Sequence, residues 1–405
     1  MSEKMNIARD LTYSLDTHKT YLNNNVLVIG TSGSGKTRSI VSPNILEATG
    51  SYVISDPKGQ LYRKYADFLK LKGYEVRTLN LVDMANSDHY NPFEYIRSEQ
   101  DIIKVAHILN FMDGGGQSRV KGDIFWDQAS ELLLSSLISY LVESVEMKER
   151  TLHYVFRLLE MIDVHMVTEG MECPYDILVS DLEKRDEESL AAKQWRKVKE
   201  AADKTLRSVV ISSAAAIGKL DFKECKKLMD KDDMRIPDIG KKKTAIFVIV
   251  SDTDRSMDGL ANLFFSQAMN ELCRAADMTE NGRLHIPVRF ILDDFATNVR
   301  IEDFPRMISS IRSREISVMI MIQALSQLRA AYGEDGTTIV GNCDTMIYLG
   351  TNDVETAQNI ADRIDKPLHD ILYMPVNTNW VFRRGQEPVN GRNIDLEEFA
   401  AEMVP

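Results

Sequence analysis

An eight-residue run rich in glycine and serine constrains this chain more than any other feature of its sequence. The run 30–37, GTSGSGKT, fits the pattern G-x-x-x-x-G-K-[ST] and directly follows the strand-like stretch 25–29. In that context the pattern predicts a strand, a tight loop and the start of a helix. Glycines let backbone N–H groups approach phosphate oxygens closely, and the positive end of the helix dipole attracts the same anion. We therefore expect a phosphate-binding loop.

The residues of this loop divide into a backbone cradle and two functional side chains. Lys36 is expected to reach the β and γ phosphates of a nucleotide, and the Thr37 hydroxyl to hold Mg²⁺. The cradle consists of Gly30, Thr31, Ser32, Gly33, Ser34 and Gly35. The alternative is a glycine- and serine-rich turn that matches the pattern by chance. Pro43, seven residues after Lys36, predicts that the following helix kinks or ends its first segment there.

Short apolar runs predict the strands of the fold. Several are almost wholly apolar, which is typical of strands that helices cover on both faces. The predicted strands are 26–29, 52–55, 76–79, 244–250, 288–292, 317–322 and 345–349. We therefore expect an α/β fold with a mostly parallel sheet.

Between about residues 96 and 240 the character of the chain changes. Apolar residues there recur at helical spacing, and β-type runs are scarce. The sequence therefore predicts an all-α domain, 96–240, inserted into a nucleotide-binding α/β domain made of 1–95 and 241–405. A chain of 405 residues is long enough for this arrangement.

A second candidate motif follows the predicted strand 288–292, where Asp293 and Asp294 stand side by side. In enzymes with a phosphate-binding loop, an aspartate at such a place supports Mg²⁺, and an adjacent acid commonly polarises the attacking water. Asp293 is the candidate on the metal side and Asp294 is the candidate base. The alternative is that the pair only caps the following helix.

The balance of charge limits the partners. The chain has 49 Lys and Arg against 61 Asp and Glu, a net charge of −12, which argues against a protein coated with nucleic acid. A local basic channel is still compatible with this total, and two clusters qualify, each with a solvated surface as the alternative. They are Lys193, Arg196, Lys197, Lys199, Lys204 and Arg207, and then Lys223, Lys226, Lys227, Lys231, Lys241, Lys242 and Lys243.

Cysteine spacing and hydropathy indicate the compartment. The four cysteines show no metal or redox spacing, so we expect reduced, mostly buried thiols in the cytoplasm. The longest apolar run, 245–250, is much shorter than a membrane-spanning helix. The first residues carry no secretory signal.

Further motifs resemble those of a known family. In chain order they are SDPKG at 55–59, YNPF at 90–93, FWD at 125–127, ILDDFA at 291–296, IRSRE at 311–315, QALSQL at 323–328 and GNCD at 341–344. Together with the phosphate loop they resemble type IV secretion system coupling proteins of the TraG/TraD type, the conjugative DNA-transfer ATPases, over about residues 15–389.

This resemblance implies a RecA-like P-loop NTPase with an all-helical insertion, acting as a homo-hexamer and existing as a hexamer or a monomer in isolation. It implies hydrolysis of ATP with Mg²⁺ to bring DNA, expected to be single-stranded, to a type IV secretion channel. The implied partners are DNA, relaxase and relaxosome proteins, and channel components. The implied location is the cytoplasmic face of the cell membrane.

The resemblance also implies roles for four more residues. Gln323 resembles the polar residue that senses the γ-phosphate. Arg312 stands where the family places an arginine finger for a neighbouring subunit, with Arg314 as a competitor and an ion pair to Glu315 as the alternative.

Asp56 and Lys58 follow a predicted strand, at the edge where α/β folds bind ligands. Their alternative is a turn with an aspartate cap. Trp126 is expected to pack in the helical core rather than to touch DNA.

Two departures from the family pattern stand out. Members usually carry a glutamate where this chain has Asp294, which predicts slow hydrolysis or a shifted water. Members typically have membrane helices before the phosphate loop, whereas this sequence begins close to it, so we expect a truncated chain or a naturally soluble member.

Two other functions stay open at this point. One is a DNA-pumping motor for segregation, repair or defence. The other is a weakly hydrolysing nucleotide-binding adaptor that recruits relaxosome proteins.

Overall fold

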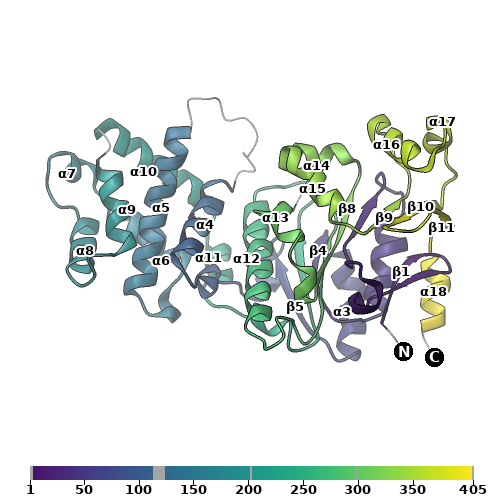
Figure 1. The fold of residues 1–405 in the computed structure, drawn as a ribbon. Coiled ribbons are helices and arrows are strands. Elements are labelled where there is room, and N and C mark those ends of the chain that lie inside the picture. Colours follow the sequence, from purple (N-terminus) through teal and green to yellow (C-terminus); the bar gives the residue numbers. More distant parts are fainter. Residues whose placement is uncertain (1–2, 113–123, 201–202, 298, 404–405) are drawn as a thin grey trace. The chain divides into compact units, whose positions relative to one another are not determined.

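The structure is a computed structural model that describes residues 3–112, 124–200, 203–297 and 299–403 (Figure 1). The chain divides into two compact units. Unit 1 comprises Met1–Thr78, Arg235–Asp252 and Ala268–Pro405, and unit 2 comprises Leu79–Met234 and Thr253–Gln267. Each unit is described below by itself.

A nine-stranded sheet forms the centre of unit 1, in the order β11-β10-β9-β3-β8-β7-β4-β6-β5. The six strands from β9 to β6 in this order are parallel, whereas β10 is antiparallel to both β9 and β11. The strands are β3 (Val26–Ile29), β4 (Ser51–Pro57), β5 (Glu75–Asn80), β6 (Thr244–Val250), β7 (Val288–Leu292), β8 (Ile316–Ile322), β9 (Thr345–Tyr348), β10 (Thr378–Arg383) and β11 (Val389–Arg392). The expected α/β class with a mostly parallel sheet is confirmed.

The parallel strands are buried on both faces, which explains their apolar runs. All four residues of β3 have no exposed surface. On one face, a single apolar cluster joins the sheet to Leu396 near the C-terminus, to a β-hairpin and to three helical segments. The hairpin and the helical segments are β1 (Lys4–Ala8), β2 (Leu11–Ser14), η1 (Lys36–Val41), α2 (Ser42–Leu46) and α3 (Gln60–Leu71).

The other helical elements of unit 1 connect the strands or follow them. They are α1 (Thr17–Thr20), η5 (Ile236–Asp238), the second half of α12 (Asp258–Asp277), α13 (Phe304–Ile308), η6 (Arg312–Arg314), α14 (Leu325–Tyr332), η7 (Gly333–Asp335), α15 (Gly336–Gly341), α16 (Val354–Ile364), α17 (Leu368–Leu372) and α18 (Leu396–Met403).

The helix after β3 changes its geometry next to Pro43. Its first segment, η1, is π-helical, and the chain then continues as α2. The Asn44 side chain donates hydrogen bonds to the carbonyl oxygens of Ile40 and Asn6, at 2.8 Å each. The expected irregularity at Pro43 is therefore present, and the side chain of Asn44 fastens the irregular turn to β1.

Helices make up unit 2. They are η2 (Met84–Asn86), η3 (Pro92–Tyr95), α4 (Glu99–Asn110), α5 (Ile124–Ser144), η4 (Met147–Glu149), α6 (Leu152–Glu160), α7 (Val164–Thr168), α8 (Pro174–Glu183), α9 (Leu190–Lys199), α10 (Asp203–Gly218), α11 (Lys223–Leu228) and the first half of α12. The long helix α5 packs against α4, α9 and α10. Because neighbours surround it, apolar residues occupy much of its circumference.

The limits of the units differ from the expected domain limits of 96 and 240. Residues 79–95 and 253–267 group with the helices instead of with the sheet. The Tyr90 hydroxyl donates to Gln267 Oε1 at 2.5 Å, and the Gln267 amide donates to the Pro92 carbonyl at 2.9 Å. The Tyr90 ring also packs edge-on against Phe264. These contacts join residues that are far apart in sequence, so sequence spacing alone does not reveal them.

The expectations about membrane-spanning helices and about the cysteines can be compared with the described residues. No described helix has the length and apolar character needed to cross a bilayer. The four cysteines are free thiols, of which Cys173 and Cys225 are buried and Cys273 and Cys343 are half-buried.

Candidate active site

Four parallel strands of the sheet end at one edge and bring distant segments together. Gly30, Gln323 and Asp293 directly follow β3, β8 and β7, which are neighbours in register. Asp56 is the second-last residue of β4, the next strand in the sheet. The Gly30 N–H donates to the Ile322 carbonyl at 3.0 Å. This edge therefore carries most of the residues predicted to bind a nucleotide.

The loop 30–37 has a backbone that glycine makes possible. A Cβ on Gly30 would lie 2.4 Å from Ser34 Oγ, and Gly33 and Gly35 have φ of +79° and +94°, a region in which other residues are strained. Ser34 Oγ is buried and has no hydrogen-bond partner among the described residues. A tight loop that buries a hydroxyl without a partner is suited to bind an oxyanion, because an oxygen atom of the anion can accept a hydrogen bond from that hydroxyl.

The Lys36 side chain folds back over this loop. Its Nζ donates to the carbonyl oxygens of Gly30 at 2.6 Å and Thr31 at 3.0 Å. Burial lowers the pKa of Lys36, while the carboxylates of Asp293 and Asp294 act in the opposite direction. A buried cation beside two carboxylates is held in place for a ligand that carries several negative charges.

Thr37 and Asp293 meet although 256 residues separate them. Thr37 Oγ1 donates to Asp293 Oδ2 at 2.8 Å. Burial raises the pKa of Asp293, and the Asp294 carboxylate adds to this rise, whereas the Thr37 hydrogen bond and Lys36 oppose it. A hydroxyl and a carboxylate in contact at the end of a phosphate loop are suitable oxygen ligands for Mg²⁺.

Asp294 adopts a left-handed backbone conformation, with φ of +51°. Its N–H donates to Asp293 Oδ1 at 3.1 Å. Asp and Asn tolerate this conformation better than longer side chains do. The backbone therefore gives a physical reason for an aspartate at this position.

Gln323 lies beside the loop, and its backbone is fixed from two sides. Its N–H donates to Gln327 Oε1 at 2.7 Å, and its carbonyl accepts from Thr351 Oγ1 at 3.1 Å. The side chain of Gln327 also donates to Thr297 Oγ1. Contact between Gln323 and a γ-phosphate stays a prediction.

The Asp56 carboxylate is directed at its own chain. It accepts the N–H groups of Leu61 at 3.0 Å and Tyr62 at 2.7 Å, and so caps the start of α3. This geometry corresponds to the capping alternative. Lys58 forms an ion pair with Asp252 at 2.8 Å, a partner that sequence reasoning missed. Roles for Asp56 and Lys58 in nucleotide binding stay predictions.

The buried Asp56 carboxyl gives the protein a specific dependence on pH. Burial raises the pKa of Asp56 to about 6, although its two backbone hydrogen bonds oppose the rise. The folded state therefore binds this proton more tightly than the unfolded chain. The resulting stability is fully present below about pH 4 and is lost as the pH rises through about 6, an effect on the order of 3 kcal/mol.

We expect Asp56→Asn to remove this dependence, because asparagine does not titrate. The free energy of unfolding of both proteins is measured by denaturant titration from pH 4.5 to 7.5, and the difference between wild type and variant is compared across this range. The wild type should become more stable relative to the variant as the pH falls. A difference that stays constant over this range would show that Asp56 is ionised throughout.

Arg312 lies at the opposite edge of the sheet from the phosphate loop. It precedes the seven-residue strand β8 and Gln323 follows that strand, so about 20 Å separate the two ends. Arg312 Nη2 donates to the Thr17 carbonyl at 3.3 Å. Glu315 pairs instead with Arg283 at 2.6 Å. The expected alternative, an Arg312–Glu315 ion pair, is therefore absent from the described residues.

The competitor Arg314 is engaged elsewhere. Its guanidinium donates to both carboxylate oxygens of Asp277, at 2.8 and 3.0 Å. Arg312, which has one hydrogen bond to a backbone carbonyl among the described residues, is therefore held less firmly than Arg314. Because it is far from the phosphate loop of its own chain, Arg312 could act as an arginine finger only for another subunit, and that role stays a prediction.

Among the described residues, six of the thirteen members of the two basic clusters form ion pairs with acidic neighbours. The ion pairs are Lys193–Glu188, Arg196–Glu183, Lys199–Asp176, Lys226–Asp221, Lys231–Asp233 and Lys241–Asp238. The side chain of Lys204 lies outside the described residues. This pairing corresponds to the solvated-surface alternative. Trp126 is half-buried and packs edge-on against Phe125.

Arg289 is a buried cation that sequence reasoning missed. It is the second residue of β7 and is 6% exposed. Its signal in the sequence is a single charged residue within an otherwise apolar strand, VRFIL. Buried charges are rare unless they are paired.

Comparison with known proteins gives relatives over most of the chain. Protein VirD4 of Rhizobium radiobacter is 24% identical over 355 residues, which are 84% of this chain and 47% of that protein. Protein VirD4 of Agrobacterium fabrum is 22% identical over 391 residues, 93% of this chain and 54% of that protein. The chain thus spans about half the length of the curated relatives it matches.

Solved structures of the bacterial conjugative coupling protein TrwB share the fold. The unbound form of TrwBdeltaN70 has a TM-score of 0.69 at 15% identity, covering 98% of this chain and 89% of that one. The TrwB complex with ADP and Mg²⁺ has a TM-score of 0.63 at 16% identity, covering 91% and 85%. The expected RecA-like fold is confirmed by this likeness.

The sequence model described as "Type IV secretory system Conjugative DNA transfer" matches residues 2–366. That range contains the phosphate loop, the Asp293–Asp294 pair and Gln323. With nine-tenths of its residues matched, the chain belongs to the type IV secretory system conjugative DNA transfer family.

Proposed function

We propose that this chain is an ATP-driven motor that couples relaxase-bound DNA to a type IV secretion channel. The observation that carries the proposal is the hydrogen bond between Thr37 and Asp293 at the end of a phosphate loop, in a chain of the conjugative DNA transfer family. TrwB, which has the same fold, is solved with ADP and Mg²⁺.

The loop residues suit the triphosphate of ATP. The backbone of 30–37 would surround the phosphates, and Ser34 Oγ would gain the partner that it otherwise lacks. Lys36 would exchange its bonds to the Gly30 and Thr31 carbonyls for phosphate oxygens. Thr37 and Asp293 would hold Mg²⁺, which draws charge from the β and γ phosphates when it is bound.

Two residues at the same edge would act on the attacking water and the γ-phosphate. Asp294 would orient the water and accept its proton. The backbone of Gln323 is held by Gln327 and Thr351. Its side chain would contact the γ-phosphate, so that loss of this phosphate on hydrolysis would be felt at the end of β8. Both roles require a contact at the sheet edge where Asp293 lies.

Arg312 would complete the site of a neighbouring subunit. Because it lies at the far edge of its own sheet, it would stabilise transition-state charge only across an interface between copies. We therefore propose a homo-hexamer as the acting form. The motor would act on single-stranded DNA at the cytoplasmic face of the membrane, with relaxosome and channel proteins as its partners.

ATP-dependent displacement of streptavidin from biotin-tagged DNA tests the proposed movement. Wild type should displace streptavidin from single-stranded DNA in the presence of ATP and Mg²⁺, and Lys36→Ala should not. Displacement from duplex DNA alone would indicate a segregation or repair motor. ATP-independent binding of DNA without displacement, or no binding at all, would contradict a translocating motor.

The Asp294 side chain predicts a slow chemical step. We expect Asp294→Glu to raise turnover by up to roughly tenfold, because the longer side chain reaches further toward the water. The left-handed backbone at this residue opposes the gain, so Asp294→Asn, which keeps the backbone preference and removes the base, is the matched control. Single-turnover hydrolysis measures the step. Equal or lower turnover in Asp294→Glu would disprove the slow-base explanation.

A further inference from the structure

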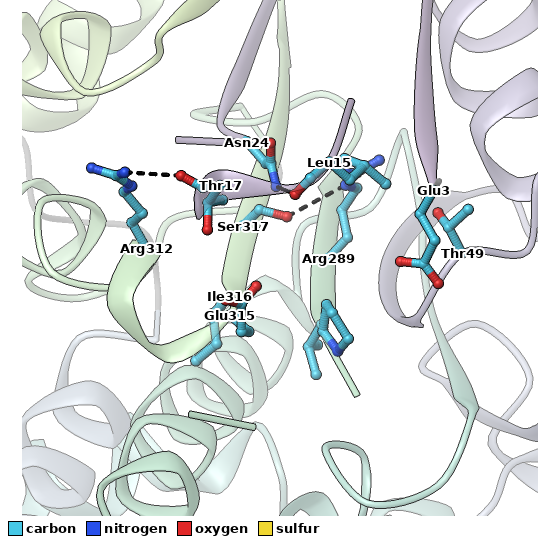
Figure 2. A pocket seen from close by; sticks show the side chains of 12 residues that line it. Glu3, Leu15, Thr17, Asn24, Thr49, Arg289, Arg312, Glu315, Ile316 and Ser317 are labelled. Carbon is cyan, nitrogen blue, oxygen red and sulfur yellow. Dashed lines mark hydrogen bonds between the residues drawn. The ribbon is translucent and has the colours of Figure 1, made fainter. Parts of the chain in front are cut away.

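A small cavity lies at the edge of the unit 1 sheet that faces away from the phosphate loop (Figure 2). It has a volume of about 40 Å³ and opens where β7 and β8 begin. Its polar lining includes Glu3, Thr17, Asn24, Arg289, Glu315 and Ser317. A cavity of this size holds a few water molecules or one small ion.

Arg289 supplies a buried guanidinium to this cavity. In the sheet register it stands between Tyr52 on β4 and Ser317 on β8. Its Nε donates to Ser317 Oγ over a long 3.4 Å, and its Nη1 is buried without a hydrogen-bond partner among the described residues. Guanidinium groups keep their charge in proteins. This charge is therefore buried without a matching ion pair, which is costly unless another group compensates it.

The charges around the cavity favour an anion. Arg312, which is exposed, also lines the cavity, but its guanidinium is turned to the Thr17 carbonyl and not toward Arg289 (Figure 2). The Glu315 carboxylate is neutralised by its ion pair with Arg283. The Glu3 carboxylate also lines the cavity and attracts Arg289 electrostatically. Among the described lining residues, Arg289 is thus the buried cation without a close ion pair, and an anion would compensate its charge.

We propose that this cavity is a second oxyanion site that takes inorganic phosphate or sulfate. The Arg289 Nη1 group donates to the anion from the buried side of the cavity. The volume excludes a nucleotide, so the site is distinct from the phosphate loop. An anion here joins the starts of β7 and β8 to the N-terminal segment that carries Glu3 and Thr17. The proposal does not rest on the proposed motor function.

Calorimetric titration of inorganic phosphate tests the site. The titration uses Lys36→Ala, so that the phosphate loop does not contribute, and holds ionic strength constant with chloride. One phosphate should bind per chain. Adding Arg289→Met should weaken binding by about tenfold or more, because a charge-assisted hydrogen bond is lost. Melting curves in the absence of phosphate check that each variant is folded.

Two further variants make the test specific. Glu3→Gln should tighten binding by roughly threefold, because it removes the carboxylate that competes for Arg289. Arg289→Lys keeps the charge, so it should retain part of the affinity and serves as the reference if Arg289→Met does not fold. No phosphate binding to Lys36→Ala would mean that water fills the cavity and would overturn the proposal. Unchanged binding in both Arg289 variants would also overturn it.

Discussion

Replacing Lys36 by alanine is expected to lower kcat/KM for ATP by roughly 10³-fold or more, because the loop loses its only buried cation near the γ-phosphate. Lys36 is 7% exposed, and its Nζ already lies over the loop carbonyls of Gly30 and Thr31. The substitution also leaves Asp293 and Asp294 without the cation beside them. Two uncompensated carboxylates would then repel the triphosphate.

Steady-state phosphate release measures this loss. Lys70→Ala is the matched control, because Lys70 is a lysine on α3 whose Nζ pairs with Asp67 on the surface. Its turnover should equal that of wild type. A loss of less than tenfold in Lys36→Ala would show that the loop does not bind the reacting phosphates.

Replacing Asp293 by asparagine is expected to remove the dependence of nucleotide binding on Mg²⁺. The Thr37 hydroxyl can still donate to the asparagine oxygen, so the hydrogen bond at 2.8 Å and the fold should survive. The negative charge that attracts the cation is lost, and hydrolysis should fall by roughly 10²- to 10³-fold.

Fluorescence titration of a nucleotide analogue with and without Mg²⁺ measures this effect. In wild type, Mg²⁺ should tighten binding, and in Asp293→Asn the two curves should coincide. Asp67→Asn is the control, because Asp67 is an exposed aspartate on α3. If Mg²⁺ tightens binding equally in Asp293→Asn, the metal is held by other residues.

The buried strands of this fold could be predicted from sequence because they are covered on both faces. All seven predicted strands are present, and β3, β6 and β7 have the predicted limits. The hairpin β1–β2, the edge strand β11 and its neighbour β10 were missed. In β11 three of the four residues are exposed and two of them are polar, and in β10 buried and half-exposed positions alternate, so neither gives a continuous apolar run.

Parts of the site follow from local sequence, and others depend on strand order. The loop 30–37 is a local feature, so its residues could be identified directly. The contact between Thr37 and Asp293 requires β8 to lie between β3 and β7, which no local pattern specifies. The direction of the Asp56 carboxylate toward α3 depends on the turn that follows β4. The place of Arg312 at the far edge likewise depends on the direction of β8.

The stimulation of ATP turnover by DNA tests the central claim most directly. Phosphate release by the wild-type chain is measured with Mg²⁺, with and without single-stranded DNA, at a protein concentration where solution mass shows the oligomeric state. A DNA-driven motor predicts several-fold stimulation that disappears in Lys36→Ala. Turnover that does not respond to DNA in the assembled protein, or stimulation that survives Lys36→Ala, would contradict it.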